Sequence, residues 1–124
     1  MPVIPLPDGV YGTIHEILNT DGYIAWRVGT GENVELLYIK SEMPGGGSRL
    51  LTAMVDALRI NPPYCTVFGF TRCCNDVAHA FYRKWGFALS RVKGVYSDGE
   101  AIVFSTKYTD LLEVITRHRQ APGI

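Results

Sequence analysis

The sequence lacks the features of several protein classes. Its 124 residues include 12 Lys or Arg and 12 Asp or Glu, so the formal net charge is zero. A chain without excess positive charge lacks the general attraction of a nonspecific nucleic-acid binder. No apolar run approaches the ~20 residues that span a bilayer. The first residues, Met1 to Pro5, have neither the basic region nor the apolar stretch of a secretory signal. We therefore expect neither a membrane partner nor a strong nucleic-acid partner.

Cysteine is scarce, with only Cys65, Cys73 and Cys74 in the chain. An odd number with two adjacent residues argues against a disulfide framework and favours a reducing, cytoplasmic location. No CxxC or HxxxH spacing occurs, so we expect no metal site. The adjacent pair is either redox-active or, in the simpler interpretation, one buried thiol beside a bystander.

The composition is that of a globular protein, with 47% hydrophobic and 19% charged residues. The length suits one domain over residues 1–124. Three prolines in the first seven residues predict an extended arm over residues 1–9. Residues 109–124 are expected to form a C-terminal helix, from about Asp110 to Arg119, and a tail.

The front of the chain predicts an antiparallel meander. Val10 to Leu18 is ambiguous, because its β-branched and aromatic residues suggest a strand while three apolar positions also suit a helix. Tyr23 to Val28 and Val34 to Lys40 read as strands, each preceded by a turn rich in Gly, Asn and Asp.

The pattern becomes helical after the glycines. From Ser48 the apolar residues share one helical face until Asn61-Pro62-Pro63. Tyr64 to Phe70 reads as a strand, and a second helix begins at Asn75 or Asp76. Its expected core stripe is Val77, Ala78, Phe81 and Trp85, with Gly86 at its end. Two strands follow, at about Ala88 to Tyr96 and Ala101 to Tyr108.

The element order predicts an α/β (α+β) fold with a mixed, mostly antiparallel sheet. Its central strand–helix–strand unit implies one parallel strand pair with a right-handed crossover, and helices flank the sheet.

Gly45-Gly46-Gly47 connects a strand to a helix. The first turn of a helix has unpaired N–H groups and a partial positive charge, and glycines let a ligand approach the backbone. The turn therefore suits phosphate oxygens, with Ser48 adding a hydroxyl and Arg49 a charge. Alternatively, the glycines serve a tight connection only. The spacing fits neither a P-loop nor the dinucleotide GxGxxG pattern.

The second helix carries the most specific pattern in the chain. Asn75 to Phe87 resembles the GNAT acyltransferase signature N-x-x-A-x-x-F/L-Y-x-K-x-G-F at every specified position. The glycine turn lies about thirty residues upstream, where GNAT proteins carry their pyrophosphate loop. The resemblance covers about Val34 to Tyr108, and it implies a small N-acetyltransferase that uses acetyl-CoA as co-substrate.

The resemblance also implies roles for individual residues. Ile39 and Ser41 would pair through their backbones with the pantetheine amides of CoA at the end of a splayed central strand. The N–H groups of the glycine turn would hold the pyrophosphate. Asn75 would lie beside the pantetheine arm, and Phe81 and Lys84 would flank the cofactor. Tyr82 would protonate the leaving thiolate as a general acid; its alternative role is that of a boundary tyrosine that only packs. The cofactor-binding residues are then Ile39, Ser41, Gly45, Gly46, Gly47, Ser48, Arg49, Asn75, Phe81 and Lys84.

Acylation of an amine also needs a base. Glu35 is the main candidate, because it is expected to share a face of a central strand with Leu37 and Ile39, where a carboxylate needs a partner or a function. His15, Glu16 and His79 are other candidates, although His79 is expected on the solvated face of its helix. Attack by an already neutral amine needs no base.

Two departures from the GNAT pattern motivate alternatives. Glu42 stands where the signature loop has Arg or Gln, and the loop before Gly45 is about two residues short. Only about 33 residues precede the central strand, which predicts an open acceptor groove or one completed by a second subunit in a homodimer. The alternative function is an inactive CoA-binding or structural protein. A third is an interaction module that uses Arg117, His118 and Arg119. The acceptor, an amine-bearing small molecule, peptide or protein, is not specified.

Overall fold

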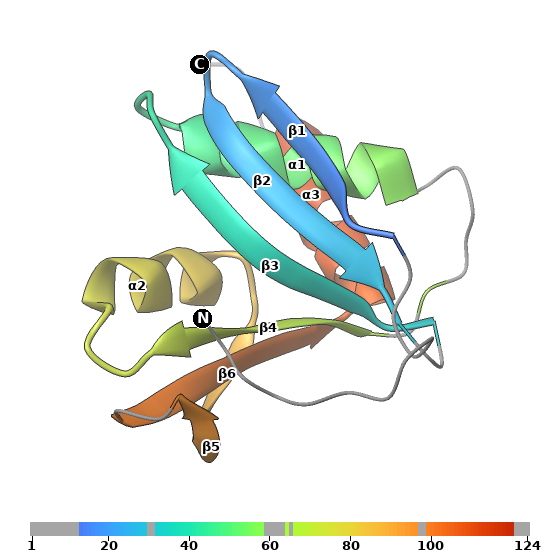
Figure 1. Ribbon diagram of the computed structural model, residues 1–124. Coiled ribbons are helices and arrows are strands. Elements are labelled where there is room, and N and C mark those ends of the chain that lie inside the picture. The colour runs from blue at the N-terminus through green and yellow to red at the C-terminus, as the bar shows by residue number, and fades with distance from the viewer. Residues whose placement is uncertain (1–12, 30–31, 59–63, 65, 97–98, 121–124) are drawn as a thin grey trace. The chain divides into compact units, whose positions relative to one another are not determined.

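The computed structural model describes residues 13–29, 32–58, 64, 66–96 and 99–120. The chain divides into two compact units (Figure 1). One spans Pro7–Cys65 and is called the N-terminal unit below; the other includes Thr66–Ile124 and is called the C-terminal unit. Among the described residues, no helix is long and apolar enough to cross a membrane. The expected arm over residues 1–9 lies outside the described residues.

The N-terminal unit is an antiparallel meander with one helix. Strands β1 (His15–Asn19), β2 (Gly22–Val28) and β3 (Val34–Ser41) pair in sequence order. Helix α1 (Gly46–Leu58) follows β3 and lies along one face of these strands (Figure 1). The ambiguous segment from Val10 to Leu18 therefore contains a strand, because pairing with β2 supplies the partner that the sequence pattern alone does not reveal.

A β-bulge in β3 changes which side chains face α1. Ile39 pairs with Ile24, but the register then shifts, and Leu36 pairs with Trp26. One extra residue, Leu37, therefore stands on β3 opposite the step between Ala25 and Trp26. Directly paired residues share a face of an antiparallel sheet, so Ile39 lies on the same face as Leu36.

Glu35 lies on the opposite face from Ile39, because it pairs with Arg27. The prediction that Glu35 and Ile39 share a face is therefore wrong. A strict alternation of side chains was assumed, and the bulge interrupts it.

The core of the N-terminal unit lies between α1 and the strand face that carries Ile24 and Trp26. The predicted apolar face of α1 is confirmed: its buried residues are Leu50, Leu51, Met54, Val55 and Leu58, together with Gly46. At the far end of α1, Leu58 and Ala57 line a small pocket with Trp26 and Val28.

The C-terminal unit holds three antiparallel strands and two helices. Strands β4 (Thr66–Arg72), β6 (Gly99–Lys107) and β5 (Ala88–Tyr96) lie in that spatial order. Helix α2 (Asp76–Lys84) connects β4 to β5, and helix α3 (Tyr108–Gln120) follows β6 without a gap. The predicted elements of this half are confirmed, with boundaries within about two residues of the expected ones.

One member of the predicted α2 core stripe is wrong. Val77 is 84% exposed, whereas Tyr82 and Trp85 are buried. Val77 lies in the first turn of a nine-residue helix. The partly or fully buried side chains of this helix begin at Ala78. The inner face is therefore rotated toward Tyr82 relative to the predicted stripe.

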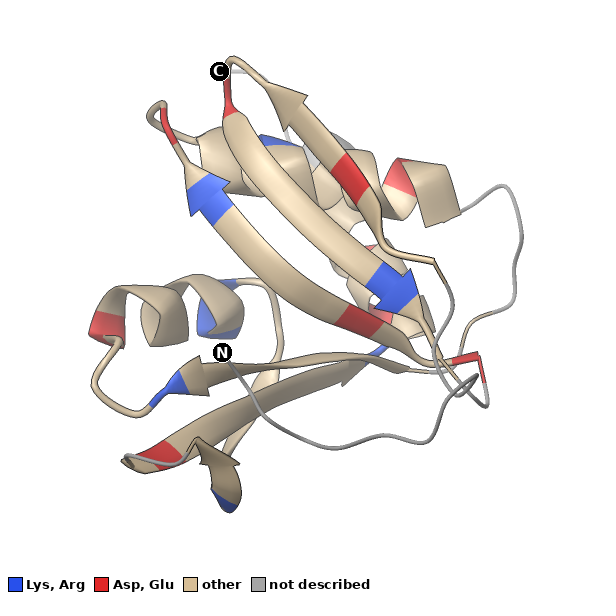
Figure 2. Cartoon of the chain, in the orientation of Figure 1, with Lys and Arg blue, Asp and Glu red and all other residues tan. Residues whose placement is uncertain are grey.

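Charged residues of both signs occur in both units, and they are spread over many helices and strands (Figure 2). This distribution agrees with the zero net charge of the whole sequence.

Gly46 supports a first prediction about stability. A Cβ atom at Gly46 would lie 2.5 Å from the carbonyl oxygen of Asp21 and 2.8 Å from the Ser41 hydroxyl. Gly to Ala within a helix normally stabilises, but this overpacking is expected to cost about 1–3 kcal/mol. We expect Gly46→Ala to lower the free energy of unfolding in urea. Gly99→Ala is the matched control, because nothing lies within 4 Å of a Cβ there. Equal stabilities of the two variants would contradict the prediction.

Candidate functional site

The glycine turn places a helix N-terminus directly after β3. Gly45 has a φ of +72°, which other residues adopt only with strain, and α1 begins at the next residue. The Gly46 N–H donates to the carbonyl oxygen of Met43 at 2.8 Å, and the Arg49 N–H donates to that of Gly45 at 3.2 Å. The N–H groups of Gly47 and Ser48 lie between these two in the first helical turn, where backbone donors have no intrahelical partner. These two amides suit an anion such as a phosphate group.

Arg49 does not extend toward a free ligand in this structure. Its guanidinium donates to the Asp21 carboxylate from Nε at 2.8 Å and from Nη2 at 2.7 Å, and to the Pro44 carbonyl at 3.0 Å. The hydrogen bond from Arg49 lowers the pKa of Asp21 below its ordinary value. Arg49 therefore holds the turn in place, and its charge is already balanced by a carboxylate.

The last residues of β3 and Glu42, which follows it, differ in their burial and contacts. Ile39 is half-buried and Ser41 is exposed, and the Ser41 hydroxyl donates to the Met43 carbonyl at 2.7 Å. Glu42 is exposed and forms a surface ion pair with Lys40 at 3.4 Å. The backbone N–H of Glu42 donates to the Asp21 carbonyl at 2.8 Å. The Glu42 carboxylate thus lies beside the ammonium of Lys40 at the end of β3.

Glu35 is a buried carboxylate with a defined partner. It is 5% exposed, and its Oε1 accepts hydrogen bonds from Arg27 Nε at 3.0 Å and Nη2 at 2.9 Å. A buried charge is costly unless it is paired in this way. The sequence indicated that Glu35 needed a partner, but it could not identify Arg27 without the strand register.

The helix α2 begins and ends where the sequence predicts, and local hydrogen bonds close both of its ends. The Asn75 side chain accepts a hydrogen bond from the Ala78 N–H at 3.2 Å and caps the helix N-terminus. At the other end, Phe87 N–H donates to Tyr82 and Gly86 N–H to Arg83, both at 3.0 Å. With a φ of +87° at Gly86, this is a Schellman motif. Asn75 therefore has a structural role, in addition to any contact with a cofactor.

Tyr82 lies in an aromatic cluster on the inner side of α2. Its ring stacks on Phe104 with centroids 3.7 Å apart and an angle of 8° between the planes. Phe81 and Phe87 approach its edge, each with a centroid distance of 5.4 Å. Burial raises the pKa of Tyr82 above the ordinary tyrosine value, and Tyr96 adds to the shift. The hydroxyl therefore keeps its proton to higher pH than an exposed tyrosine does.

Two expectations about the neighbourhood of α2 are wrong. His79 is not solvated: it is 8% exposed, and its Nε2 donates to the carbonyl oxygen of Arg72 at 3.0 Å. The end of β4 offers this acceptor, which the helical pattern alone does not reveal. Cys73 and Cys74 are both exposed, so the interpretation with one buried thiol is also wrong.

The predicted residues thus form two groups. In the N-terminal unit, Ser41 and the glycine turn meet around Asp21, while Glu35 pairs separately with Arg27. In the C-terminal unit, Phe81, Tyr82 and Lys84 belong to α2, Asn75 caps its N-terminus, and Lys84 is exposed at its other end. Sequence reasoning missed Asp21 and Arg27. Asp21 was visible as part of a turn signal, but its partner is 28 residues away.

No protein-family model matches the sequence, and no curated protein sequence is significantly similar to it. Solved structures do match. An acetyltransferase assigned to the GNAT family from Desulfovibrio desulfuricans matches with a TM-score of 0.66 and 20% identity, over 77% of this chain and 69% of that one. Ard1 from Thermoplasma volcanium matches with a TM-score of 0.61 and 24% identity, over 68% of this chain. The chain has the GNAT fold.

A third match is Naa50 from Arabidopsis thaliana, solved in complex with the bisubstrate analogue CoA-Ac-MVNAL. Its TM-score is 0.56 and its identity 23%, over 68% of this chain. The chain spans 61% of Ard1 and 63% of Naa50, less than two thirds of either protein. The predicted fold class, a mixed and mostly antiparallel α/β fold with flanking helices, is confirmed by these matches to the GNAT fold.

The Glu35–Arg27 pair supports a second prediction. Removing one charge of a buried pair leaves the other uncompensated, which costs about 3–5 kcal/mol when both are fully buried. Since Arg27 is partly exposed, we expect Glu35→Gln to lower the free energy of unfolding by about half of that. Glu42→Gln, which removes an exposed pair, is expected to cost under about 0.5 kcal/mol. Similar losses for the two variants in urea unfolding would contradict the burial argument.

The raised pKa of Tyr82 gives a third prediction. Unfolding exposes the hydroxyl and returns its pKa to about 10. Above that pH the unfolded state loses a proton that the folded state keeps, so stability falls as pH rises, by at most about 1.4 kcal/mol per pH unit. We expect Tyr82→Phe to flatten this alkaline loss in urea unfolding between about pH 9 and pH 11. Tyr38→Phe is the control, because Tyr38 is exposed in the folded state. An unchanged slope for Tyr82→Phe would refute the assignment.

Proposed function

We propose that the chain is an acyl-CoA-dependent N-acetyltransferase that transfers an acetyl group from acetyl-CoA to a primary amine. The observation that carries the proposal is Tyr82, a buried tyrosine that keeps its proton, at the signature position on α2 of a GNAT fold. In the proposed reaction the amine attacks the thioester carbonyl directly, and no acyl-enzyme forms. The C–S bond then breaks, and the Tyr82 hydroxyl protonates the departing thiolate.

The glycine turn supports the proposal from the cofactor side. The N–H groups of Gly47 and Ser48 would bind the pyrophosphate of CoA through the backbone. Gly46 fits this role, because its lack of a side chain lets α1 begin directly against Asp21 and Ser41. Arg49 would act indirectly, by holding the turn through Asp21. Since the Glu42 carboxylate is paired with Lys40, it adds less repulsion toward a diphosphate than the sequence implies.

The proposal assigns contacts with the acyl end and the pantetheine arm to β3 of the N-terminal unit and, separately, to α2 of the C-terminal unit. The bulge at Leu37 leaves a residue of β3 without a partner on β2, and unpaired strand amides of this kind would polarise the thioester carbonyl. Ile39 and Ser41 would pair with the pantetheine amides beyond the bulge. Asn75, Phe81 and Lys84 would flank the cofactor from α2.

Glu35 remains the candidate base. Its Oε1 accepts hydrogen bonds from Arg27, and a carboxylate at this position would accept a proton from an incoming ammonium group directly or through water. His15 and Glu16 on β1 are the other candidates. His79 is less suitable, because its Nε2 is already engaged with Arg72.

The acceptor is proposed to be the α-amine of a peptide or protein. Naa50, which shares the fold, was solved with CoA joined to a peptide in one analogue. We also propose that a second subunit completes the acceptor groove. The proposed location of the protein is the cytoplasm. The second candidate function is CoA binding without turnover, favoured by the pairing of the candidate base Glu35 with Arg27.

The proposal predicts both binding and turnover. CoA should raise the melting temperature of the protein, since a ligand of the folded state stabilises it in proportion to ln(1 + [L]/Kd). Acetyl-CoA with a peptide that has a free α-amine should release free thiol, and the same peptide with an acetylated N-terminus should not. We expect Tyr82→Phe to lower kcat by about 100-fold while the CoA-induced thermal shift remains.

Tyr38→Phe is the matched control for the kinetics, because it removes a tyrosine hydroxyl from an exposed position on β3. A thermal shift without thiol release from any amine would favour the inactive alternative. No thermal shift at millimolar CoA would refute both. Full activity in Tyr82→Phe would refute the role of Tyr82 alone.

A further inference from the structure

A pocket of about 340 Å³ lies between the end of α2 and the last turns of α3. It is lined by Lys84, Trp85, Val114, Arg117 and His118. All five residues belong to the C-terminal unit. The pocket is near Lys84 and thus about 13 Å along α2 from the cap at Asn75, at 1.5 Å per residue. Of the residues given a cofactor role above, only Lys84 also lines this pocket.

The indole of Trp85 forms the inner wall of the pocket. Trp85 is 2% exposed, and its Nε1–H has no hydrogen-bond partner among the described residues. A buried tryptophan usually finds a partner for this group, and an unpaired buried donor costs about 1–3 kcal/mol. A free donor in the wall of a pocket is most simply explained by an acceptor that the chain itself does not supply.

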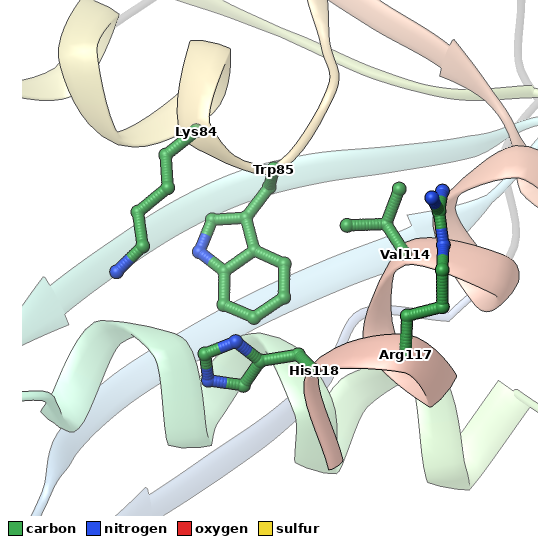
Figure 3. A pocket seen from close by; sticks show the side chains of 5 residues that line it. All are labelled: Lys84, Trp85, Val114, Arg117 and His118. Carbon is green, nitrogen blue, oxygen red and sulfur yellow. The ribbon is translucent and has the colours of Figure 1, made fainter. Parts of the chain in front are cut away.

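Lys84 and His118 both lie beside the indole. Figure 3 shows the indole nitrogen facing the Lys84 side chain, with the His118 ring below the six-membered ring of the indole. The Lys84 ammonium is 5.9 Å from the centroid of the Trp85 ring, and the His118 ring meets that ring edge-on at 4.9 Å. Both Lys84 and His118 are exposed, so their side chains can move aside to admit a ligand to the indole N–H.

The charge of this side of the pocket is not balanced by the part of the chain that the structure describes. No ion pair of Lys84 or His118 is found there, and no acidic residue lines the pocket. Arg117 is different, because it pairs with Glu113 at 3.8 Å, and Figure 3 shows its guanidinium beside Val114, away from the indole nitrogen. The free donors therefore come from Lys84, Trp85 and His118.

Basic residues at the ends of two helices have a simpler explanation, since cations there interact favourably with the helix dipoles. That explanation accounts for the presence of these basic side chains at the helix ends. It does not account for the indole N–H, which is neutral and faces the same side. A ligand that accepts hydrogen bonds and carries negative charge satisfies all three groups.

We propose that this pocket is an oxyanion site, which binds a phosphate or carboxylate group through the indole N–H of Trp85, the ammonium of Lys84 and the imidazole of His118. Hydrogen bonds to an anionic oxygen are stronger than neutral ones. The indole and Val114 supply an apolar wall for the body of the ligand. The source of the oxyanion is either a free ion or the phosphates of CoA.

The indole N–H provides a direct test by NMR. The chain has two tryptophans, so the ¹H–¹⁵N spectrum should contain two indole signals. The signal that is lost in Trp85→Phe belongs to Trp85. If Trp85→Phe does not fold, Trp26→Phe gives the same assignment, because the signal that remains belongs to Trp85. Titration with inorganic phosphate or acetate, at an ionic strength held constant with sodium chloride, should shift the Trp85 signal downfield and saturably. The Trp26 signal, from the other unit, should stay in place.

Charge-removing variants make the test specific. We expect Lys84→Gln to raise the dissociation constant for phosphate, measured from the shift of the Trp85 signal, about tenfold. This is the usual effect of losing one charge-assisted hydrogen bond. Lys93→Gln removes the same charge from an exposed position on β5 of the same unit and should leave the affinity unchanged.

Two further arms identify the source of the oxyanion. If the Trp85 signal shifts downfield at a lower concentration of CoA than of phosphate, CoA is the source of the oxyanion. If it shifts with phosphate but not with CoA, the source is a free ion. A Trp85 signal that moves with none of phosphate, acetate and CoA would overturn the proposal, and so would equal affinities in Lys84→Gln and Lys93→Gln. Because the readout is binding at Trp85, it stands or falls independently of acyl transfer.

Discussion

The contacts of Asp21 fix the geometry of the N-terminal unit. Its carbonyl oxygen accepts the Glu42 N–H, its carboxylate holds the guanidinium of Arg49, and the bare Cα of Gly46 packs against it. These contacts join the β1–β2 turn, the end of β3 and the start of α1. Because the β1–β2 turn is distant in sequence from the other two segments but holds both of them, it restrains the first turn of α1. The backbone donors of the glycine turn are thereby held in position before any ligand arrives.

The C-terminal unit is organised around aromatic packing instead. Tyr82 stacks on Phe104, and Phe87 contacts both rings. The Schellman motif at Gly86 allows Phe87 to turn back toward this cluster directly after the helix. The signature residues of α2 therefore also build the core, and a substitution at Tyr82 or Gly86 changes packing as well as chemistry. Activity measurements on such variants need the stability measurements beside them.

Much of the fold could be predicted from the sequence, because the signals were local. The apolar face of α1, the Asn75 cap and the Gly86 terminus each depend on residues within one or two helical turns. Predictions that depended on distant partners were wrong or incomplete. The face of Glu35 depended on a bulge, the burial of His79 on the Arg72 carbonyl, and the engagement of Arg49 on Asp21. The GNAT resemblance predicted the fold correctly. The roles of the individual site residues stay predictions.

The bulge at Leu37 also affects how this strand tolerates change. One extra residue, Leu37, determines which side chains of β3 face α1. Deleting it would shift the part of the strand before the bulge, which includes Glu35, by one position relative to Ile39. A substitution at Leu37 keeps the register, but a deletion or insertion of one residue inverts part of the strand. Any alignment of this chain with shorter or longer relatives is therefore most error-prone at this point, where a misplaced gap would exchange buried and exposed positions along β3.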